Sequence, residues 1–343
     1  MLQDMQILNP IEYVCWDELT DRRDGFNFFY GSHWARVICE TYGYRPLYFA
    51  VLDGDSIDTL LPVMEVRSIL TGTRGVSLPF TDYCEPILGE GVEMDHVLEY
   101  VSRYGRVHGW KSIQVRGGRC EGTAAESFYV HRLNLEPDCN RIFSRLDGSR
   151  KRNIKKASRE GVEVARHCDE AAVGRYYRLH CKTRKRQGVP PQPYRFFNNM
   201  HRHIISQGLG CIMLASFKGR DIAGSVFFNF RDQAFYKFGA SDRLFQNLRP
   251  ADLVMWEAVK WFAGSGCRRL CFGRTSPDNE GLRRYKAAWA TEEKKIDYYK
   301  YDLQHDGFIR SSTYVSPGRR RLLQSVPVFM SRLLGRVLYR HVG

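Results

Sequence analysis

The 343-residue sequence predicts an α/β protein made of two similar lobes. The main observation is an internal repeat: two apolar strands around a polar turn, then a helix, a glycine and a further strand, occur twice in this order. The second observation is size, because about 100–200 residues form one domain and this chain has room for two. Hydrophobic residues make up 43% of the chain, which is enough for packed cores and excludes a mainly disordered protein.

The first copy of the repeat covers residues 47–116. It opens with LYFAVLDGDSIDTLLPVMEV, in which Asp53-Gly54-Asp55 joins two apolar strands by a turn that needs a positive φ. Residues 95–107 then place apolar side chains at helical spacing. Gly109 is expected to end this helix in the left-handed conformation, before the strand in KSIQVRGG.

The second copy covers residues 211–274 and repeats this order. Its hairpin is CIMLASFKGRDIAGSVFFNF, with the turn at Lys218-Gly219-Arg220. A helix over 251–266 ends at Gly266, and CRRLCFGR is the following strand. Residues 141–161 between the copies approximate one more helical stripe. We therefore expect an N-terminal lobe over 1–140, a C-terminal lobe over 141–304 and a tail over 305–343.

The positive charge is concentrated in two segments. The chain has 52 Lys and Arg against 38 Asp and Glu, a net charge of +14. Residues 144–188 hold 14 basic and 5 acidic residues, and residues 310–343 hold 7 arginines and no acid. The remainder of the chain is near neutral. One basic cluster is ordinarily a solvated face, but two beside a neutral remainder favour a polyanionic partner: a phosphate-bearing substrate, RNA or an anionic membrane.

Several classes of site and location are disfavoured. The ten cysteines are scattered without a CxxC pair, which indicates a reducing compartment and neither a disulfide framework nor a zinc site. Cys267 and Cys271 are expected as core residues of a strand. The sequence holds no HExxH spacing, no P-loop and no G-x-S-x-G elbow, so we predict no metal centre. The sequence contains no run of about 18 apolar residues, so we expect no transmembrane helix. The first residues do not resemble a signal peptide.

Five motifs resemble those of a known family when taken together. They are HWARVICETYG, LPFTDYCEP, SRKRNIKKASREGVEV, KRQGVPPQPYRFF and the run from FYKFGAS to GLRRYKAAWA. Their order and spacing are similar to the Fem family of aminoacyl-tRNA-dependent peptidoglycan-bridge transferases. The subgroup they resemble most is the Fem-related proteins of PEP-CTERM/exosortase exopolysaccharide systems.

This resemblance implies a fold and a class of reaction. It implies two tandem GNAT-like acyltransferase lobes with mixed, mostly antiparallel sheets flanked by helices. It also implies an enzyme that moves an acyl group to an amine. The donor is an aminoacyl-tRNA in Fem enzymes and an acyl-CoA in related GNAT proteins, so we expect one of these two anionic co-substrates and no permanently bound cofactor.

The same resemblance assigns the catalytic residues. Lys286 in RRYKAAWA is a cation between a basic pair and an apolar Ala-Ala-Trp segment. The lysine at this place in Fem enzymes stabilises developing charge, so Lys286, with Tyr285 before it, is the expected catalytic pair. The alternative is a surface lysine on an amphipathic helix.

Substrate contacts are expected at six further residues. Carried over from the family, Arg186 grips a substrate phosphate, whereas the alternative is a solvated basic run. Arg249 precedes Pro250 at the start of a helix, where free N–H groups attract an anion such as the pyrophosphate of the donor. The remaining expected substrate contacts are Asp82 and Tyr83, in a loop between two prolines, and Tyr236 and Asp242, beside the strand YKFGAS.

The sequence departs from the family patterns at two places. Ile38, with Arg36 nearby, stands where Fem enzymes carry a lysine one helical turn after the tryptophan of the first motif. The coenzyme A loop R/Q-x-x-G-x-G/A of ordinary GNAT enzymes is absent, and SDRLFQNLRPADL takes its place.

The tail carries one apolar helical stripe. Its members are Phe329, Met330, Leu333, Leu334, Val337 and Leu338. Arg332, Arg336 and Arg340 recur alongside it, and Arg319, Arg320 and Arg321 precede it. This pattern fits an interfacial helix that binds an anionic membrane through residues 319–343, and it equally fits a terminal helix that docks its stripe on the fold.

We expect an N-acyltransferase or aminoacyltransferase that acts on a cell-envelope sugar or peptide, an exopolysaccharide or peptidoglycan precursor. The donor is acyl-CoA or aminoacyl-tRNA, and in the latter case tRNA is a partner. The alternative is a non-catalytic protein of the same fold that binds RNA or polysaccharide precursors. Either protein is expected in the cytoplasm, free or peripheral on the inner face of the cytoplasmic membrane.

Overall fold

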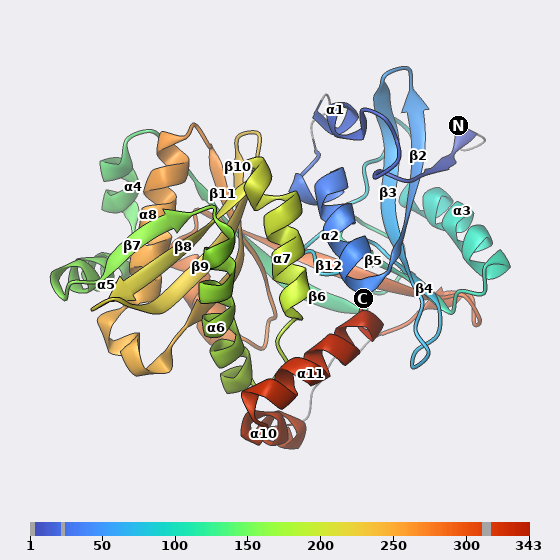
Figure 1. Cartoon of the computed structure of the whole chain (residues 1–343). Helices are drawn as coiled ribbons and strands as arrows, with labels where there is room; N and C mark the ends of the chain where they lie inside the picture. The colour runs from blue at the N-terminus through green and yellow to red at the C-terminus, as the bar shows by residue number, and fades with distance from the viewer. Residues whose placement is uncertain (1–3, 22–24, 311–316) are drawn as a thin grey trace. The chain divides into compact units, whose positions relative to one another are not determined.

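The computed structural model describes residues 4–21, 25–310 and 317–343 (Figure 1). The chain forms two compact units. Unit 1 contains Met1–Phe128, Lys295–Tyr314 and Val337–Gly343, and unit 2 contains Tyr129–Lys294 and Val315–Arg336. The expected fold class, mixed sheets that are mostly antiparallel and flanked by helices, is confirmed.

Unit 1 is built on the strand order β1-β2-β3-β4-β5-β12. The pairs are antiparallel except for β4 with β5, which is parallel. The strands are β1 (Gln6–Leu8), β2 (Arg45–Asp53), β3 (Ser56–Val66), β4 (Arg74–Val76), β5 (Ser112–Arg116), β12 (Glu292–Asp302), of which most lies in this unit, and β13 (Gly307–Phe308). The helices are α1 (Trp16–Asp21), η2 (Phe28–Tyr30), α2 (Ser32–Tyr42), α3 (Met94–Val107) and η5 (Tyr339–His341).

Unit 2 is built on the strand order β6-β11-β10-β9-β8-β7. Here too one pair, β10 with β11, is parallel. The strands are β6 (Glu126–Asn134), β7 (Glu163–His167), β8 (Gly210–Phe217), β9 (Arg220–Phe230), β10 (Gln233–Ser241) and β11 (Arg269–Thr275). The helices are α4 (Cys139–Arg145), α5 (Gly148–Arg159), α6 (Glu170–Gln187), α7 (Tyr194–His203), η3 (Ile205–Gln207), η4 (Arg243–Leu248), α8 (Pro250–Gly264), α9 (Glu280–Ala287), α10 (Pro317–Ser325) and α11 (Val328–Leu338).

The sheet of unit 2 has a helix layer on each face (Figure 1). Phe227 of β9 packs on Phe262 of α8, with ring centroids 5.6 Å apart. Gly224, three residues earlier and therefore on the other face, lies against Tyr176 of α6. Helices α5 and α8 thus cover one face, and α6 and α7 cover the other. Successive side chains of a strand point to opposite faces of the sheet. The strands of unit 2 therefore place apolar side chains against both helix layers.

The repeated hairpins and helix ends are confirmed. Gly54 in the first turn has φ 54°, and Lys218 and Gly219 in the second have φ 49° and 73°. Gly109 and Gly266 follow α3 and α8 with φ 69° and 83°. The residue after each of these glycines donates its N–H to a carbonyl five residues earlier, the bond of a Schellman motif.

One sequence prediction is corrected, and the compact units divide the chain differently from the expected segments. The stripe over 141–161 is not one helix, because Asp147 caps a new helix by accepting a hydrogen bond from the N–H of Ser149. The compact units also differ from the expected segments 1–140, 141–304 and 305–343. The change of unit lies at residues 128/129, β12 returns to unit 1, and the tail is divided between both units.

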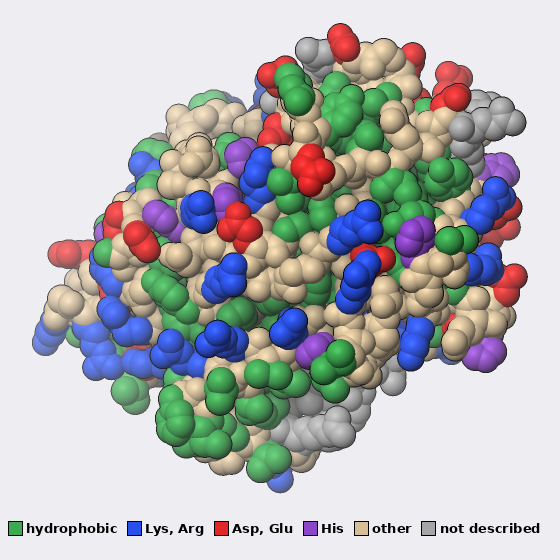
Figure 2. Space-filling model, turned by 45° about the vertical axis from the view of Figure 1, so that its right-hand side comes forward, with side chains coloured by type: hydrophobic (Ala, Val, Ile, Leu, Met, Phe, Trp, Pro, Cys, Tyr) green, Lys and Arg blue, Asp and Glu red, His purple; other side chains and the backbone are tan. Residues whose placement is uncertain are grey.

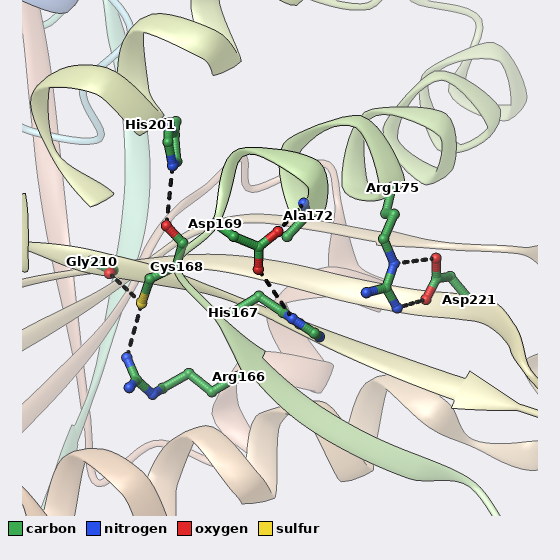
Figure 3. Close-up of polar contacts among 9 residues, drawn as sticks. All are labelled: Arg166, His167, Cys168, Asp169, Ala172, Arg175, His201, Gly210 and Asp221. Carbon is green, nitrogen blue, oxygen red and sulfur yellow. Dashed lines mark hydrogen bonds and ion pairs between the residues drawn. The ribbon is translucent and has the colours of Figure 1, made fainter. Parts of the chain in front are cut away.

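Polar side chains fix the start of α6 (Figure 3). The carboxylate of Asp169 accepts a hydrogen bond from the N–H of Ala172 at 2.9 Å and lies 3.5 Å from Nδ1 of His167. One turn later, Arg175 donates two hydrogen bonds, at 2.9 and 2.5 Å, to the carboxylate of Asp221 in β9. The helix that carries Arg186 is therefore tied to the sheet at its beginning.

One histidine contact and two buried cysteines of unit 2 serve packing and local structure. His201 Nε2 lies 3.1 Å from the main-chain oxygen of Cys168 (Figure 3). Cys267 and Cys271 are both buried, as expected, but β11 begins at Arg269, so only Cys271 lies in the strand. Within the described residues, no three His, Cys, Asp or Glu side chains gather around one metal position. None of the described helices is long and apolar enough to cross a membrane.

Candidate active site

The parallel strands β10 and β11 pair only at their beginnings. The ladder joins Gln233–Phe235 to Arg269–Cys271 and stops there, although both strands continue. At the same point a β-bulge between Tyr236 and Phe238 shifts the register of β10 against β9. Ligands of open α/β sheets bind at the carboxyl ends of strands, so the separation of these two strands indicates a binding site.

The bulge places Tyr236 and Phe238 on opposite faces of the sheet, with Tyr236 on the face covered by α8. Without it, Tyr236 and Phe238 would share one face of the sheet. Instead the ring of Tyr236 packs on Phe227 at 5.6 Å, whereas Phe238 packs on Phe197 of α7 at 5.5 Å. Gly239 leaves room for the phenol, because a Cβ at this position would overlap the Tyr236 oxygen. Burial raises the pKa of Tyr236 to about 12, so the phenol stays protonated at neutral pH.

Helix α8 starts beside the carboxyl end of β10. Pro250 occupies its first position, where the missing N–H costs no hydrogen bond. Arg249 precedes it as the N-cap with φ 59°, a left-handed conformation that costs a residue with a Cβ about 1–2 kcal/mol. Free N–H groups and the helix dipole attract anions at such a terminus. The chain therefore holds a strained arginine at the N-terminus of α8.

The connection before α8 is closer to the coenzyme A loop than the sequence analysis stated. Residues Gln246-Asn247-Leu248-Arg249-Pro250-Ala251 follow R/Q-x-x-G-x-G/A at every fixed position except Arg249, which replaces the first glycine. The left-handed φ of Arg249 explains why a glycine suits this position. The expectation that the loop is absent is thus corrected to a loop with one substitution.

A pocket of about 750 Å³ opens at this helix terminus. It is lined by α5, by the connection from β10 to α8, and by α9. Its charged lining residues are Arg150, Arg249, Arg284, Asp147 and Asp252. Arg249 and Arg284 are exposed, so their guanidinium groups are accessible to a bound anion. A pocket of this size holds a substantial part of a nucleotide-type donor.

Two side chains of α5 hold the acid at the start of α8. Arg150 Nη1 donates a hydrogen bond to Asp252 at 2.6 Å, and Asn153 Nδ2 donates one to the other carboxylate oxygen at 3.0 Å. Burial raises the pKa of Asp252, and the charge of Arg150 limits that rise. The Arg150 guanidinium also lies 5.1 Å from the ring centre of Tyr285. This network gives the pocket a rigid wall.

Tyr285, one of the expected site residues, lines this pocket. Burial, together with the nearby Asp252 and Tyr236, raises its pKa well above the ordinary value. Its phenol is therefore a neutral hydrogen-bond donor over the physiological pH range.

Lys286 lies outside the lining of this pocket. Its ammonium is buried and donates hydrogen bonds to the carbonyl oxygens of Gly273, at 3.0 Å, and Arg274, at 2.9 Å. These carbonyls belong to β11, at the irregularity where its ladder with β6 is interrupted. The expected alternative of a surface lysine is thus wrong, and the contacts give Lys286 a structural task whose relation to catalysis stays a prediction.

The buried ammonium belongs to a charged cluster. His131 is fully buried with Nε2 2.8 Å from Glu293, and Arg283 donates two hydrogen bonds to the same carboxylate at 2.9 and 2.5 Å. Burial lowers the pKa of His131, the charge of Lys286 lowers it further, and Glu293 opposes both. At His131 the charge of Glu293 therefore opposes the positive charges of Lys286 and Arg283.

Arg186 lies at the carboxyl end of β10. Its Nη1 donates a hydrogen bond to the carbonyl oxygen of Ser241, a residue that lines the pocket, at 3.2 Å. Burial and the charge of Arg243 lower its pKa below the ordinary value. Arg186 is thus near the pocket without lining it.

Asp242 has several protein partners. It is buried and accepts hydrogen bonds from Lys182 at 2.7 Å, Arg220 at 3.1 Å and the N–H of Leu244 at 3.2 Å. Burial favours a higher pKa, but these hydrogen bonds and positive charges outweigh it and lower the pKa below the ordinary value. Asp242 therefore joins α6, the β8–β9 turn and η4.

Asp82 and Tyr83 lie in a constrained loop of unit 1. Leu78 and Phe80, just before them, have φ 41° and 63°, and left-handed residues with a Cβ cluster at functional sites. The main-chain oxygen of Asp82 accepts a hydrogen bond from the Tyr298 hydroxyl at 2.5 Å, and Tyr83 is buried. This hydrogen bond ties the loop to β12.

Four residues of the pocket lining were not predicted from the sequence: Arg150, Asn153, Asp252 and Arg284. Arg150 and Asn153 were in the basic helix of the third motif, but their charge alone did not distinguish them from solvated neighbours. Asp252 carried a usable signal, since an acid in the first turn of a helix marks its N-terminus. Their meeting depends on the packing of α5 against α8, which no local pattern reports.

Comparison with known proteins finds a family model that is similar to part of unit 2. Residues 148–287 match the family described as "Acetyltransferase (GNAT) domain". No curated protein matches the chain. The domain match confirms the prediction of an acyltransferase, and it covers the β10–α8 connection, Lys286 and all the lining residues of the pocket except Asp147 and Ala288.

Solved structures with a similar fold cover most of the chain. FemX has a TM-score of 0.67 and 12% identity over 88% of this chain and 98% of its own. A tandem GNAT protein from the clavulanic acid biosynthesis pathway has a TM-score of 0.53 and 8% identity over 87% and 98%. N-myristoyltransferase from Saccharomyces cerevisiae with bound myristoyl-CoA has a TM-score of 0.51 and 10% identity over 88% and 80%. Identities this low support the fold, and function must be argued from the site.

Proposed function

We propose that this protein transfers an acyl or aminoacyl group from an anionic donor to an amine of a cell-envelope precursor. The observation that carries the proposal is the pocket where the N-terminus of α8, Arg249 and Arg284 converge at the carboxyl end of β10. Both a helix terminus and guanidinium groups suit the phosphates of such a donor.

Acyl-CoA is the favoured donor. The connection Gln246–Ala251 follows the coenzyme A loop with one substitution, and the yeast N-myristoyltransferase of similar fold binds myristoyl-CoA. Aminoacyl-tRNA is the second donor, supported by the Fem-like motifs and by the basic residues of α5 and α6. In either case the donor is a co-substrate and not a resident cofactor.

The reaction needs an oriented amine and a polarised carbonyl. The amine nitrogen attacks the acyl carbon, a C–N bond forms, and the C–S bond of the thioester or the C–O bond of the aminoacyl ester breaks. The amine loses one proton to solvent, and the leaving thiolate or ribose oxygen gains one. We assign Tyr285 and Tyr236, which burial keeps protonated, as hydrogen-bond donors near the leaving group. Lys286 holds β11 in place and adds positive charge behind it.

The acceptor follows from the Fem resemblance. It implies a muramyl peptide or an exopolysaccharide precursor, and we propose Asp82 and Tyr83 as acceptor contacts in unit 1. We propose Arg186 as a phosphate contact. Asp242, which already holds Lys182 and Arg220, is proposed to position those cations. We also propose that the enzyme works on the inner face of the cytoplasmic membrane.

Binding of coenzyme A and of aminoacyl-tRNA, followed by calorimetry, tests the proposal. Losing a charge-assisted hydrogen bond costs about 1.5–3 kcal/mol, so Arg249→Ala and Arg284→Ala should each weaken binding of the true donor about 10- to 150-fold. Arg268→Ala changes an exposed arginine outside the pocket and should alter affinity less than twofold. Mass analysis of amine-bearing muramyl peptides and amino sugars then detects the transferred group. Absence of binding by both donors, or unchanged binding by the pocket variants, would refute the proposal.

A further inference from the structure

Helix α11 presents its apolar face to solvent. Phe329 is 71% exposed, Leu333 62% and Val337 50%. The residues that α11 buries are instead small, namely Ser331 and Gly335. This is the reverse of an ordinary surface helix, whose apolar stripe faces the core.

The small face of α11 is what docks on unit 2. A Cβ at Gly335 would overlap the carbonyl oxygen of Pro191, so the two backbones touch. The guanidinium of Arg332 lies 5.4 Å from the ring centre of Tyr177 in α6. Gln324 of α10 donates a hydrogen bond to the main-chain oxygen of Arg186 at 2.8 Å. These contacts fix the rotation of α11 about its axis, so the exposed stripe is a consequence of specific packing.

The exposed stripe continues onto α10, where Leu322 is 68% exposed. Figure 2 shows the resulting group of hydrophobic side chains at the bottom of the view, where Figure 1 places α10 and α11. Single exposed apolar residues are ordinary, whereas a contiguous group marks a contact surface. We call this group the tail face, and its members are Leu322, Phe329, Met330, Leu333, Leu334 and Val337.

The C-terminal segment that carries the tail face contains basic residues and no acidic ones. Residues 307–343 contain seven arginines and no acid, and Arg321, Arg332, Arg336 and Arg340 are exposed. Figure 2 also shows a row of Lys and Arg side chains directly above the hydrophobic group. In the helical sequence, Arg332 and Arg336 follow Phe329 and Leu333 by three residues, so they flank the apolar stripe on one side.

We infer that the tail face docks on an anionic lipid bilayer. The apolar side chains enter the boundary between headgroups and acyl chains, and the arginines meet lipid phosphates. The helix lies along the surface, since α11 is too short to span the membrane. A second copy of the chain is a poor occupant, because it would bring arginines against arginines in a segment without acids. The inference deepens only the proposed location and is independent of donor and acceptor.

Flotation with vesicles tests this inference. Wild-type protein should bind phosphatidylcholine vesicles that contain 30% phosphatidylglycerol at least tenfold more strongly than pure phosphatidylcholine vesicles, and high salt should weaken the binding. The double variant Phe329→Ser/Leu333→Ser should lose at least tenfold in affinity. Arg336→Gln should lose about fivefold, from about 1 kcal/mol per arginine. All these residues are exposed, so melting temperatures should stay near wild type.

Matched controls use equally exposed residues elsewhere. Ile69→Ser/Leu70→Ser changes two apolar residues that are 94% and 65% exposed, and Arg159→Gln changes an exposed arginine; each should bind vesicles as wild type does. Vesicle binding that the tail-face variants leave unchanged would overturn the inference. So would a dimer in sedimentation that Phe329→Ser/Leu333→Ser dissolves without any vesicle binding. If vesicle binding follows the variants while no donor binds, the surface stands and the proposed reaction fails.

Discussion

Arg249 is a residue at which backbone strain and ligand binding oppose each other. Its φ of 59° suits glycine, and its side chain suits a phosphate. We expect Arg249→Gly to match or exceed wild-type stability by up to about 1 kcal/mol, because relief of the left-handed strain outweighs the extra freedom of the unfolded chain. Coenzyme A affinity should fall at least tenfold. Urea unfolding and calorimetry measure the two effects separately.

Arg249→Ala is the comparison for this prediction. Alanine removes the guanidinium but keeps a Cβ in the left-handed conformation, so it should weaken binding as the glycine variant does without any gain in stability. A glycine variant that is clearly less stable than wild type would show that the side chain supports the fold. The left-handed conformation of Arg249 would then not indicate a role in ligand binding.

Lys286 is a buried cation held by two main-chain carbonyls. Lys286→Met should lower the free energy of unfolding by about 1–3 kcal/mol, since those carbonyls lose their buried donor. It should also raise the pKa of His131, because the charge of Lys286 now lowers it. Chemical denaturation and the titration of the His131 ring in NMR spectra check both. Lys260→Met, on the exposed face of α8, should leave both values unchanged.

Enzyme kinetics test the predicted catalytic role of Lys286 separately from its effect on stability. If its charge stabilises the transition state, Lys286→Met should lower kcat about 10²- to 10³-fold with little change in substrate binding, and Lys286→Arg should retain part of the rate. The assay is run where both variants remain folded. Normal turnover by folded Lys286→Met would leave the lysine with its structural task alone.

Because the ring of His180 is buried, we expect unit 2 to lose folding stability as the pH falls. The ring is buried among aromatic side chains with Nε2 2.9 Å from Gln192, and burial lowers its pKa to about 3. In the unfolded chain the histidine has a pKa near 6.5. Below that pH the unfolded chain therefore binds a proton at His180 that the folded chain does not bind. The stability contribution is present above about pH 6.5 and lost as pH falls toward 3, about 2 kcal/mol by pH 5.

Denaturation at several pH values tests this prediction. His180→Gln, which retains a polar side chain for Gln192, should lose that part of the slope between pH 6.5 and 5. His96→Asn, at an exposed position of α3, should keep the wild-type slope. An unchanged slope in His180→Gln would mean that other groups cause the acid response.

At the scale of elements, α11 depends on a close backbone contact at Gly335. Any side chain there meets Pro191, whereas Gly264 of α8 has open space around it. Gly335→Ala should therefore destabilise the protein and make the C-terminal helices more sensitive to protease, by displacing α11. Gly264→Ala should be neutral or slightly stabilising, because alanine favours helix. Thermal melts and limited proteolysis compare the two; equal behaviour would show that α11 is loosely docked.

At the scale of the whole molecule, unit 1 is closed by a strand from late in the sequence. Residues 298–302 of β12 pair with β5, and Tyr299 and Leu303 belong to its core. A fragment of residues 1–140 lacks this strand and should not fold, because it exposes both the β5 edge and the core beneath. Residues 129–294 contain the strands and core helices of unit 2 and should fold. Circular dichroism and NMR dispersion measure both; a well-folded 1–140 fragment would contradict the division.

By itself, the sequence determined the local structure of this protein. The two hairpins, the left-handed glycines after α3 and α8 and the amphipathic character of α11 were all predictable, since each depends on backbone preferences or periodicity within a few residues. The motif around Arg249 was predictable in position, and its helix terminus is where the pocket lies.

Only the tertiary structure decided where those elements meet. The sequence could not reveal that Arg150 binds Asp252 or that Lys286 donates hydrogen bonds to carbonyl oxygens of β11. Nor could it reveal that β12 belongs mostly to unit 1, or that α11 buries its glycine and exposes its phenylalanine. Each of these outcomes depends on contacts between residues distant along the chain. Periodicity shows that a helix has an apolar face, but the direction of that face is set by whichever surface its neighbours fit most closely.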